Sequence, residues 1–268
     1  MTAYTPIDLS IFPPEREQRL KEIFRYNLFE TMLYRSNLWM HEQRVSWLVE
    51  EIAPLLAPHL TFDAEKARTL ALVHDDAEIL TGDVQAGHKA QMTKEELEAV
   101  DKAEEVAIEE LCKGYPAEVN GYSYRELLTA ALRKDTVESQ LSSYADKLDG
   151  YCEGFHELFA GNISIWTSNI FYTRFFAQVD TRLPLLASAL NQAEKSPLIH
   201  PFIISPVPGK QISIAEYQRF SGRPYTAESI RMDTVRFPFY DAWKRIVLAK
   251  GGKQGESWLT TQREFMPA

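Results

Sequence analysis

The chain has only two cysteines, Cys112 and Cys152, among its 268 residues. Their spacing does not match a zinc site, and nothing in the sequence supports a disulfide between them. No apolar run approaches the roughly 20 residues that a membrane-spanning helix needs. Charges and prolines interrupt residues 1–17, unlike a signal peptide. We therefore expect a soluble protein of the reducing cytoplasm that does not bind membranes.

Glycine and basic residues are also scarce. The chain contains 12 glycines, and Gly251-Gly252 follow a predicted helix, so they do not form a phosphate-binding loop. A Gly-x-Ser-x-Gly motif is absent as well, which argues against an α/β-hydrolase. Lysine and arginine number 29 against 38 acidic residues, giving a formal net charge of −9. This balance argues against stable, charge-driven binding to nucleic acid.

Helical patterns dominate the first 195 residues. Apolar spacing and start signals predict helices over about 14–34, 39–52, 64–74, 93–113, 123–158 and 167–194. Asp63 is a suitable N-cap for the third of these helices. Thr93 and Glu96 have the spacing of a capping box at the start of the fourth. The sequence therefore predicts an all-α fold for this region.

The character of the chain changes after Ser196. Four prolines cluster between residues 197 and 208, and the runs 203–204 and 211–214 predict short strands. A final helix is expected over 239–249. We therefore predict a helical domain over 1–195 and a mixed, less regular extension over 196–268, which could cap a pocket or form an interface.

The run from His74 to Glu78 concentrates groups that bind metals and move protons. His74 and Asp75 offer a divalent ion one nitrogen and one carboxylate oxygen, and His41 and Asp146 can complete a set of four ligands from packed helices. Such a mixed set suits manganese, iron, cobalt, nickel or zinc better than calcium. On a helix, Glu78 shares a face with His74, where its carboxylate could handle a proton.

Each of these residues also has an ordinary interpretation. A His-Asp pair occurs by chance in many chains of this length, His41 alone could be a surface histidine, and Asp146 alone could be a salt-bridge partner. Their order, spacing and context together favour the metal site.

Three segments together resemble the HD-domain phosphohydrolase superfamily, and within it the bacterial 5′-deoxynucleotidase branch. They are His41–Val45, Leu72–Asp83 and Ala145–Leu148. The middle segment contains the pattern His-Asp-x-x-Glu followed by Thr-Gly-Asp, and the last contains Ala-Asp-x-Leu. The similarity covers roughly residues 20–185 of the sequence.

The resemblance implies an all-helical HD-domain bundle that binds one divalent metal ion. Manganese, cobalt, iron, nickel or zinc is expected in preference to magnesium. The implied ligands are His41, His74, Asp75 and Asp146. The implied catalytic carboxylates are Glu78 and Asp83, one acting on the attacking water and the other on the leaving oxygen. The products would be a nucleoside and phosphate, and a homodimer is an option that the sequence leaves open.

Residues that would contact the substrate are less clearly marked. The family usually carries an arginine–tryptophan segment well before its first metal-binding histidine, and here Arg35 and Trp39 lie nearest to that pattern with a different spacing. Arg44, three residues beyond His41, could reach the site from the same helix face. His88 follows the Thr-Gly-Asp loop, and Lys147 follows Asp146. His88 could equally be an ordinary solvated residue, and for Lys147 that ordinary interpretation is the favoured one.

Three functions remain open at this stage. The favoured one is hydrolysis of 5′-(deoxy)nucleoside monophosphates. A nucleoside triphosphohydrolase or a phosphodiesterase of the same superfamily is the alternative within the enzyme class. His88 is the one histidine between Asp75 and Asp146, which disfavours a two-metal phosphodiesterase. A non-catalytic nucleotide-binding HD domain is the third option, and the presence of Glu78 and Asp83 argues against it.

Overall fold

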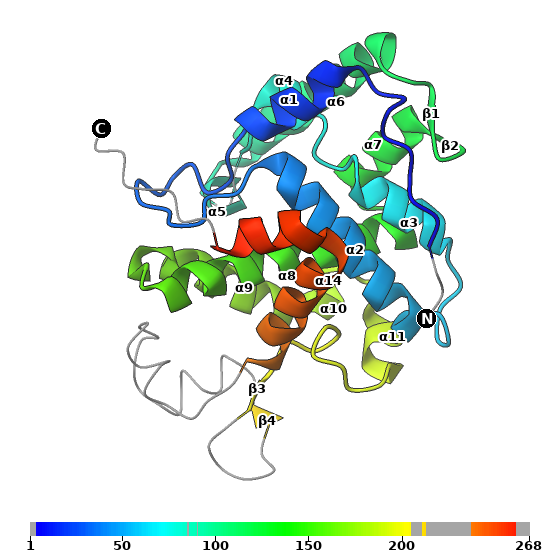
Figure 1. Cartoon of the computed structure of the whole chain (residues 1–268). Helices are drawn as coiled ribbons and strands as arrows, with labels where there is room; N and C mark the ends of the chain where they lie inside the picture. The colour runs from blue at the N-terminus through cyan, green and yellow to red at the C-terminus, as the bar shows by residue number, and fades with distance from the viewer. Residues whose placement is uncertain (1–3, 85, 90, 205–210, 213–236, 261–268) are drawn as a thin grey trace. The chain divides into compact units, whose positions relative to one another are not determined.

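The computed structural model describes residues 4–84, 86–89, 91–204, 211–212 and 237–260. This part of the chain is dominated by helices (Figure 1), which confirms the predicted all-α class. The helices are α1 (Pro14–Glu22), α2 (Leu38–Leu56), α3 (Ala64–Ala71), α4 (Glu78–Thr81), α5 (Ala86–Lys89), α6 (Lys94–Gly114), α7 (Tyr124–Arg133), α8 (Val137–Ala160), η1 (Ile163–Ile165), α9 (Trp166–Ala177), α10 (Val179–Arg182), α11 (Ala187–Gln192) and α14 (Pro238–Thr260).

Strands in the described residues form two short antiparallel pairs. β1 (Glu118–Val119) pairs with β2 (Tyr122–Ser123), and β3 (Ile203–Ile204) pairs with β4 (Gln211–Ile212). Asn120 and Gly121 connect β1 and β2 with φ values of 51° and 80°. Asn-Gly with two positive φ angles is the usual connection of a tight hairpin. The first pair was not predicted, whereas strands at 203–204 and 211–212 agree with the expectation.

The chain divides into two compact units. Unit 1 comprises residues 1–28, 36–53 and 61–146, and unit 2 comprises residues 29–35, 54–60 and 147–268. The predicted division into a domain over 1–195 and an extension over 196–268 stays a prediction, because much of the proposed extension lies outside the described residues.

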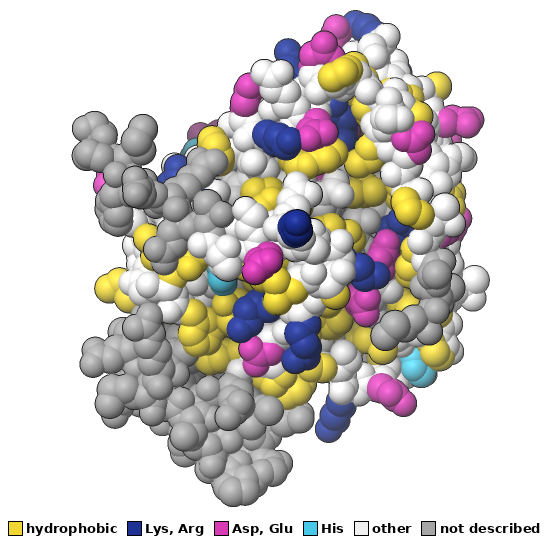
Figure 2. Space-filling view, in the orientation of Figure 1, with side chains coloured by type: hydrophobic (Ala, Val, Ile, Leu, Met, Phe, Trp, Pro, Cys, Tyr) yellow, Lys and Arg dark blue, Asp and Glu magenta, His cyan; other side chains and the backbone are white. Residues whose placement is uncertain are grey.

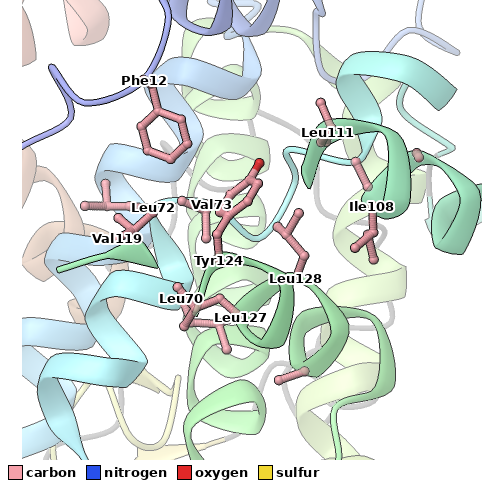
Figure 3. Packing of buried hydrophobic residues seen from close by; sticks show 13 residues of the cluster. Phe12, Leu70, Leu72, Val73, Ile108, Leu111, Val119, Tyr124, Leu127 and Leu128 are labelled. Atoms are coloured by element: carbon pink, nitrogen blue, oxygen red, sulfur yellow. The ribbon is translucent and has the colours of Figure 1, made fainter. Parts of the chain in front are cut away.

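Unit 1 is built around a hydrophobic cluster contributed by α3, α6, α7 and the segments beside them. Figure 3 shows Leu127 of α7 next to Leu70 of α3, while Leu128 of α7 lies on the side of Ile108 and Leu111 of α6. The Tyr124 ring packs edge-on against Phe12 with centroids 5.5 Å apart. The capping box at the start of α6 is present, because Thr93 accepts a hydrogen bond from the Glu96 amide and the Glu96 side chain accepts one from the Thr93 amide. This local signal explains why the start of α6 was predicted well.

Unit 2 has an aromatic core between α8, α9 and α14. The Tyr151 ring stacks on Phe239 with centroids 5.2 Å apart, and Phe155 packs edge-on against the same ring. The Tyr172 ring lies so close to Gly150 that a Cβ there would come within 2.2 Å of its hydroxyl. A glycine at position 150 therefore permits the close approach of α8 and α9.

Several predicted helices differ from the observed ones. The helix expected over 14–34 ends at Glu22, since Phe24 pairs with Asn37 in an antiparallel bridge. The helix expected over 123–158 is divided at Lys134, which adopts a left-handed conformation. Pro184 lies within the helix expected over 167–194, which is observed as α9, α10 and α11. Conversely, α2 continues through Pro54 to Leu56, and α14 continues past a kink at Gly252.

The described helices include none with the length and apolar character needed to cross a membrane. On the face drawn in Figure 2, described acidic and basic side chains are interspersed.

Candidate metal centre and active site

Three side chains of unit 1 converge from different segments of the chain. His41 lies in α2, His74 in the turns after α3, and Asp146 in α8. Each offers one ligand atom, and the three atoms lie within 4.8 Å of one another. His41 Nε2 is 3.2 Å from Asp146 Oδ1. This spacing allows one ion to contact all three groups.

Asp75 lies beside the same group of atoms. Its Oδ1 is 3.3 Å from His74 Nε2, and its Oδ2 is 3.6 Å from His41 Nε2. The structure therefore brings together all four residues that the sequence proposes as ligands. Their side chains range from fully buried His41 to Asp75, which is 17% exposed, so solvent reaches the group from the carboxylate side.

The local chain that carries His74 and Asp75 is not helical, contrary to the expectation that α3 would extend to residue 74. α3 ends at Ala71, and the amides of Val73 and Asp76 donate to carbonyl oxygens three residues earlier. The Glu78 amide repeats this pattern with Asp75 at 2.8 Å. Tight turns with a three-residue repeat bring Asp75 and Glu78 to the same side of the chain.

The surroundings of the two ring nitrogens of His74 are those of a metal ligand that binds through Nε2. Its Nδ1 lies 2.9 Å from the Ala71 carbonyl oxygen, which can only accept a hydrogen bond, so Nδ1 carries the proton. Nε2 is buried, has no hydrogen-bond partner among the described residues, and presents its lone pair. Burial lowers the pKa of His74, which favours the neutral imidazole that binds metals.

Two further carboxylates belong to this region of unit 1. Glu78 is the first residue of α4, and one of its oxygens, Oε2, is buried without a hydrogen-bond partner among the described residues. Asp83 follows Gly82, whose φ of 76° lets the chain turn directly after α4. Burial raises the pKa of Glu78 well above its usual range, and the charges of Asp75 and Asp83 raise it further.

Arg25 is a functional candidate that the sequence analysis did not select. Its guanidinium nitrogens lie 3.9 Å from Asp75 Oδ2 and 4.0 Å from Asp146 Oδ1. Its amide donates to the Ser36 carbonyl oxygen, which holds this segment beside the start of α2. The sequence does contain a pattern that could have identified Arg25. Arg25 is followed directly by the aromatic residue Tyr26, and this pair resembles the arginine–tryptophan pattern better than Arg35 does.

The predicted substrate-binding residues of α2 lie against other side chains. The Arg16 guanidinium carbon is 5.8 Å from the centroid of the Trp39 ring, and Lys21 Nζ is 6.0 Å from it. Arg44 is buried and donates to Ser36 Oγ at 3.4 Å. A role for Trp39 and Arg44 in substrate binding stays a prediction.

The other three predicted substrate-binding residues lie elsewhere. His88 is exposed on α5. Arg35 belongs to unit 2, where its guanidinium donates to the Phe29 carbonyl oxygen. Lys147 follows Asp146 on α8 and is the first residue of that helix to belong to unit 2. Their roles likewise stay predictions.

Comparison with known families gives a direct result. Residues 17–174 match the model of the family described as 5′-deoxynucleotidase YfbR-like. The chain belongs to this family. The match contains all four proposed ligands together with Glu78 and Asp83, and it confirms the resemblance seen in the sequence. The chain is thus an enzyme, a nucleotide phosphohydrolase of this family. Its His41, His74 and Asp146 form a group that could hold a metal ion.

The solved structures that are similar to the chain have low sequence identity to it, and one of them, with a TM-score above 0.5, shows the same fold. The PH0347 protein from Pyrococcus horikoshii OT3 is 22% identical, with a TM-score of 0.52 over 66% of this chain and 92% of that one. A conserved hypothetical protein from Pyrococcus furiosus is 22% identical, with a TM-score of 0.47 over 63% and 96% of the two chains. The HD phosphohydrolase DatZ of cyanophage S-2L, solved with dA and one catalytic Zn²⁺ ion, is 19% identical, with a TM-score of 0.45 over 70% and 90%. A comparison with curated proteins found no match.

The raised pKa of Glu78 predicts a pH-dependent effect on stability. The folded state holds the Glu78 proton more tightly than the unfolded state, so this stabilisation is complete below the unfolded pKa of about 4.3 and is lost as the pH rises through the folded pKa. Glutamine cannot ionise. We therefore expect Glu78→Gln to raise the Tm of metal-free protein at pH 8 more than at pH 5.

Thermal unfolding in the presence of a chelator measures this effect. Each stabilisation of about 1 kcal/mol corresponds to roughly 2–4 °C in Tm for a chain of this size. Glu105→Gln, at an exposed position of α6, is the matched control and should show no such pH dependence. An equal change in Tm at both pH values for Glu78→Gln would contradict the expected burial of the charge.

Proposed function

We propose that this enzyme hydrolyses the phosphomonoester of 5′-(deoxy)nucleoside monophosphates, with His41, His74, Asp75 and Asp146 holding the divalent ion. The observation that carries the proposal is the convergence of these four side chains in unit 1 beside Glu78, Asp83 and one arginine, Arg25. The two imidazole nitrogens and two carboxylates fit a transition metal such as zinc, manganese or cobalt. When bound, the ion would polarise the phosphoryl group and make water more acidic.

The protein's own carboxylates would handle the protons of the reaction. Phosphoester hydrolysis needs one group to orient or deprotonate the attacking water and another to protonate the leaving 5′ oxygen. Glu78 and Asp83 have raised pKa values because both are partly buried and lie near other carboxylates. A carboxyl group with a raised pKa can donate a proton near neutral pH, and its conjugate base is stronger than an ordinary carboxylate.

The charges around the site favour a small phosphate group. Arg25 and Lys89 are cationic side chains whose charges act on Glu78, and Lys89 is already paired with Glu104 at 2.8 Å. Against them stand the carboxylates of Asp75, Glu78, Asp83 and Asp146. A triphosphate carries more negative charge than a monophosphate and would need more cationic contacts than Arg25 and Lys89 provide. Arg25 would contact the phosphate of the substrate.

Phosphate release from a panel of nucleoside mono-, di- and triphosphates tests the substrate class. Metal-stripped protein would be supplied with cobalt, manganese, zinc or magnesium in turn. We expect the fastest release from 5′-monophosphates with a transition metal. Faster release from triphosphates would support the alternative phosphohydrolase, and no release from any of them while metal is bound would point to a phosphodiester substrate or a non-catalytic nucleotide-binding protein.

Replacing Arg25 by alanine should weaken catalysis without loss of metal. A charge-assisted hydrogen bond contributes about 1.5–3 kcal/mol, so kcat/KM for a monophosphate should fall by roughly 10- to 100-fold. Metal affinity should be unchanged or tighter, because a cation beside Asp75 and Asp146 has been removed. Steady-state kinetics and a cobalt titration measure both quantities. Arg19→Ala, at an exposed position of α1, is the control, and equal kinetics for the two variants would contradict the role of Arg25.

We also propose that the enzyme works in the cytoplasm, where nucleotides are metabolised. Neither Cys112 nor Cys152 forms a disulfide bond, in agreement with a reducing environment. A homodimer stays a prediction, as does the absence of a stable nucleic-acid partner.

A further inference from the structure

A single buried arginine of α1 connects the segments that carry the proposed ligands. Arg16 is 1% exposed. Its Nε lies 2.9 Å from each carboxylate oxygen of Asp76. One terminal nitrogen, Nη2, donates to Glu42 Oε2 at 2.9 Å and to the Leu72 carbonyl oxygen at 2.7 Å. The guanidinium thus has three partners that are distant from it in the sequence.

Each partner is a near neighbour of a proposed ligand. Glu42 follows His41 in α2, and Asp76 follows Asp75 in the turns after α3. Leu72 precedes His74 by two residues in the same turns. A planar guanidinium holds its donors in a fixed fork, so its partners are constrained in direction as well as in distance. Arg16 therefore constrains the spacing between α2 and the His74–Asp75 turn.

The guanidinium and its main partner are themselves held in place. The guanidinium carbon of Arg16 lies 4.4 Å from the centroid of the Phe12 ring and 5.8 Å from that of Trp39. Contacts of a guanidinium with aromatic faces are attractive and restrict its movement. Tyr124 Oη donates to Asp76 Oδ2 at 2.8 Å. Trp39, one of the two aromatic residues beside the Arg16 guanidinium, lies two residues before His41 in α2.

We infer that Arg16 is a positioning residue of the metal site, which holds the His41 segment and the His74–Asp75 segment at the separation that one ion requires. This inference rests on the ligand set proposed above. Groups that orient metal ligands change metal affinity when they are altered, although they do not touch the metal. A buried ion pair with a purely structural role would change stability alone.

Arg68 provides a matched comparison within the same unit. It is also a buried arginine, at 4% exposure, and it contacts Glu65, Glu50 and the Thr5 carbonyl oxygen. None of these three partners is adjacent to a proposed ligand in the sequence. Arg16→Lys and Arg68→Lys each keep the positive charge and remove the guanidinium fork. The two variants differ in the segments that lose these contacts, since only the partners of Arg16 are neighbours of proposed ligands.

A cobalt titration of metal-stripped protein compares the two variants, with the visible absorption of bound Co²⁺ and the Tm recorded alongside. We expect both variants to have a lower Tm. Arg16→Lys should weaken cobalt affinity by about 10- to 100-fold and shift the absorption bands, whereas Arg68→Lys should leave both unchanged. At saturating metal, Arg16→Lys should lower kcat more than it raises KM.

Each result decides the inference. Wild-type affinity and absorption bands in Arg16→Lys, with a Tm loss like that of Arg68→Lys, would make Arg16 a structural residue only. If Arg16→Lys does not fold, Tyr124→Phe takes its place, because it removes the hydroxyl that holds Asp76, and roughly 2- to 10-fold weaker cobalt binding is expected. Unchanged affinity in folded Tyr124→Phe would overturn the inference. A wild-type protein that binds no cobalt would instead overturn the proposed ligand set and, with it, this inference.

Discussion

An Asp75→Asn variant is expected to lose both metal binding and phosphohydrolase activity. Asp75 places its two oxygens 3.3 and 3.6 Å from the Nε2 atoms of His74 and His41. Asparagine has nearly the same shape, so the surrounding turn keeps its packing while the anionic ligand is removed. Metal ions contribute several kcal/mol to transition-state stabilisation. Activity should therefore fall by about 10³-fold or more.

Elemental analysis of the purified variant, together with phosphate release, checks this expectation. Asp101→Asn is the control, because Asp101 is an exposed residue of α6 and should retain wild-type metal content and rate. If Asp75→Asn kept a full complement of metal, Asp75 would not be a ligand, and the set would have to be completed by another residue.

Glu78→Ala is expected to separate metal binding from turnover. The variant should retain its metal, because the four proposed ligands remain, and its kcat should drop by about 10²- to 10⁴-fold, the usual contribution of a group that transfers a proton. The buried Oε2 atom and the raised pKa of Glu78 support this role. Single-turnover measurements at saturating metal isolate the chemical step from substrate binding.

A comparison with Asp83 assigns the two carboxylates to the two proton transfers. A substrate with a better leaving group needs less protonation of its departing oxygen. The variant that lacks the proton donor should therefore recover activity on such a substrate, and the variant that lacks the water-activating base should not. Full activity of Glu78→Ala on an ordinary monophosphate would show that the role given to Glu78 is wrong.

The parts of the fold that depend on local signals could be predicted from the sequence. The start of α6 follows from the capping box of Thr93 and Glu96, and the start of α3 follows from Asp63, which accepts a hydrogen bond from the Lys66 amide. The position of the site could be predicted from the run His74–Glu78, because ligands that are adjacent in the sequence can be recognised without knowledge of the tertiary fold.

The parts that depend on distant contacts could not be predicted in this way. Helical spacing continues beyond Glu22, but the bridge between Phe24 and Asn37 ends α1 and brings Arg25 to the site. Arg16 appears in the sequence as one charged residue among several in an amphipathic helix. Its burial is understood only when Glu42 and Asp76, which are far apart in the chain, are seen on the same guanidinium.

The position of Asp146 has a consequence for the order in which the enzyme is assembled. Three proposed ligands lie within the first 75 residues, whereas the fourth lies in α8, beyond α6 and α7. A chain folding during synthesis presents the first three well before the last. The site can be completed only when α8 has formed, so metal would bind the folded unit and add its binding free energy to that unit's stability. Metal bound at this site would then show that unit 1 has folded from α2 to the first turns of α8.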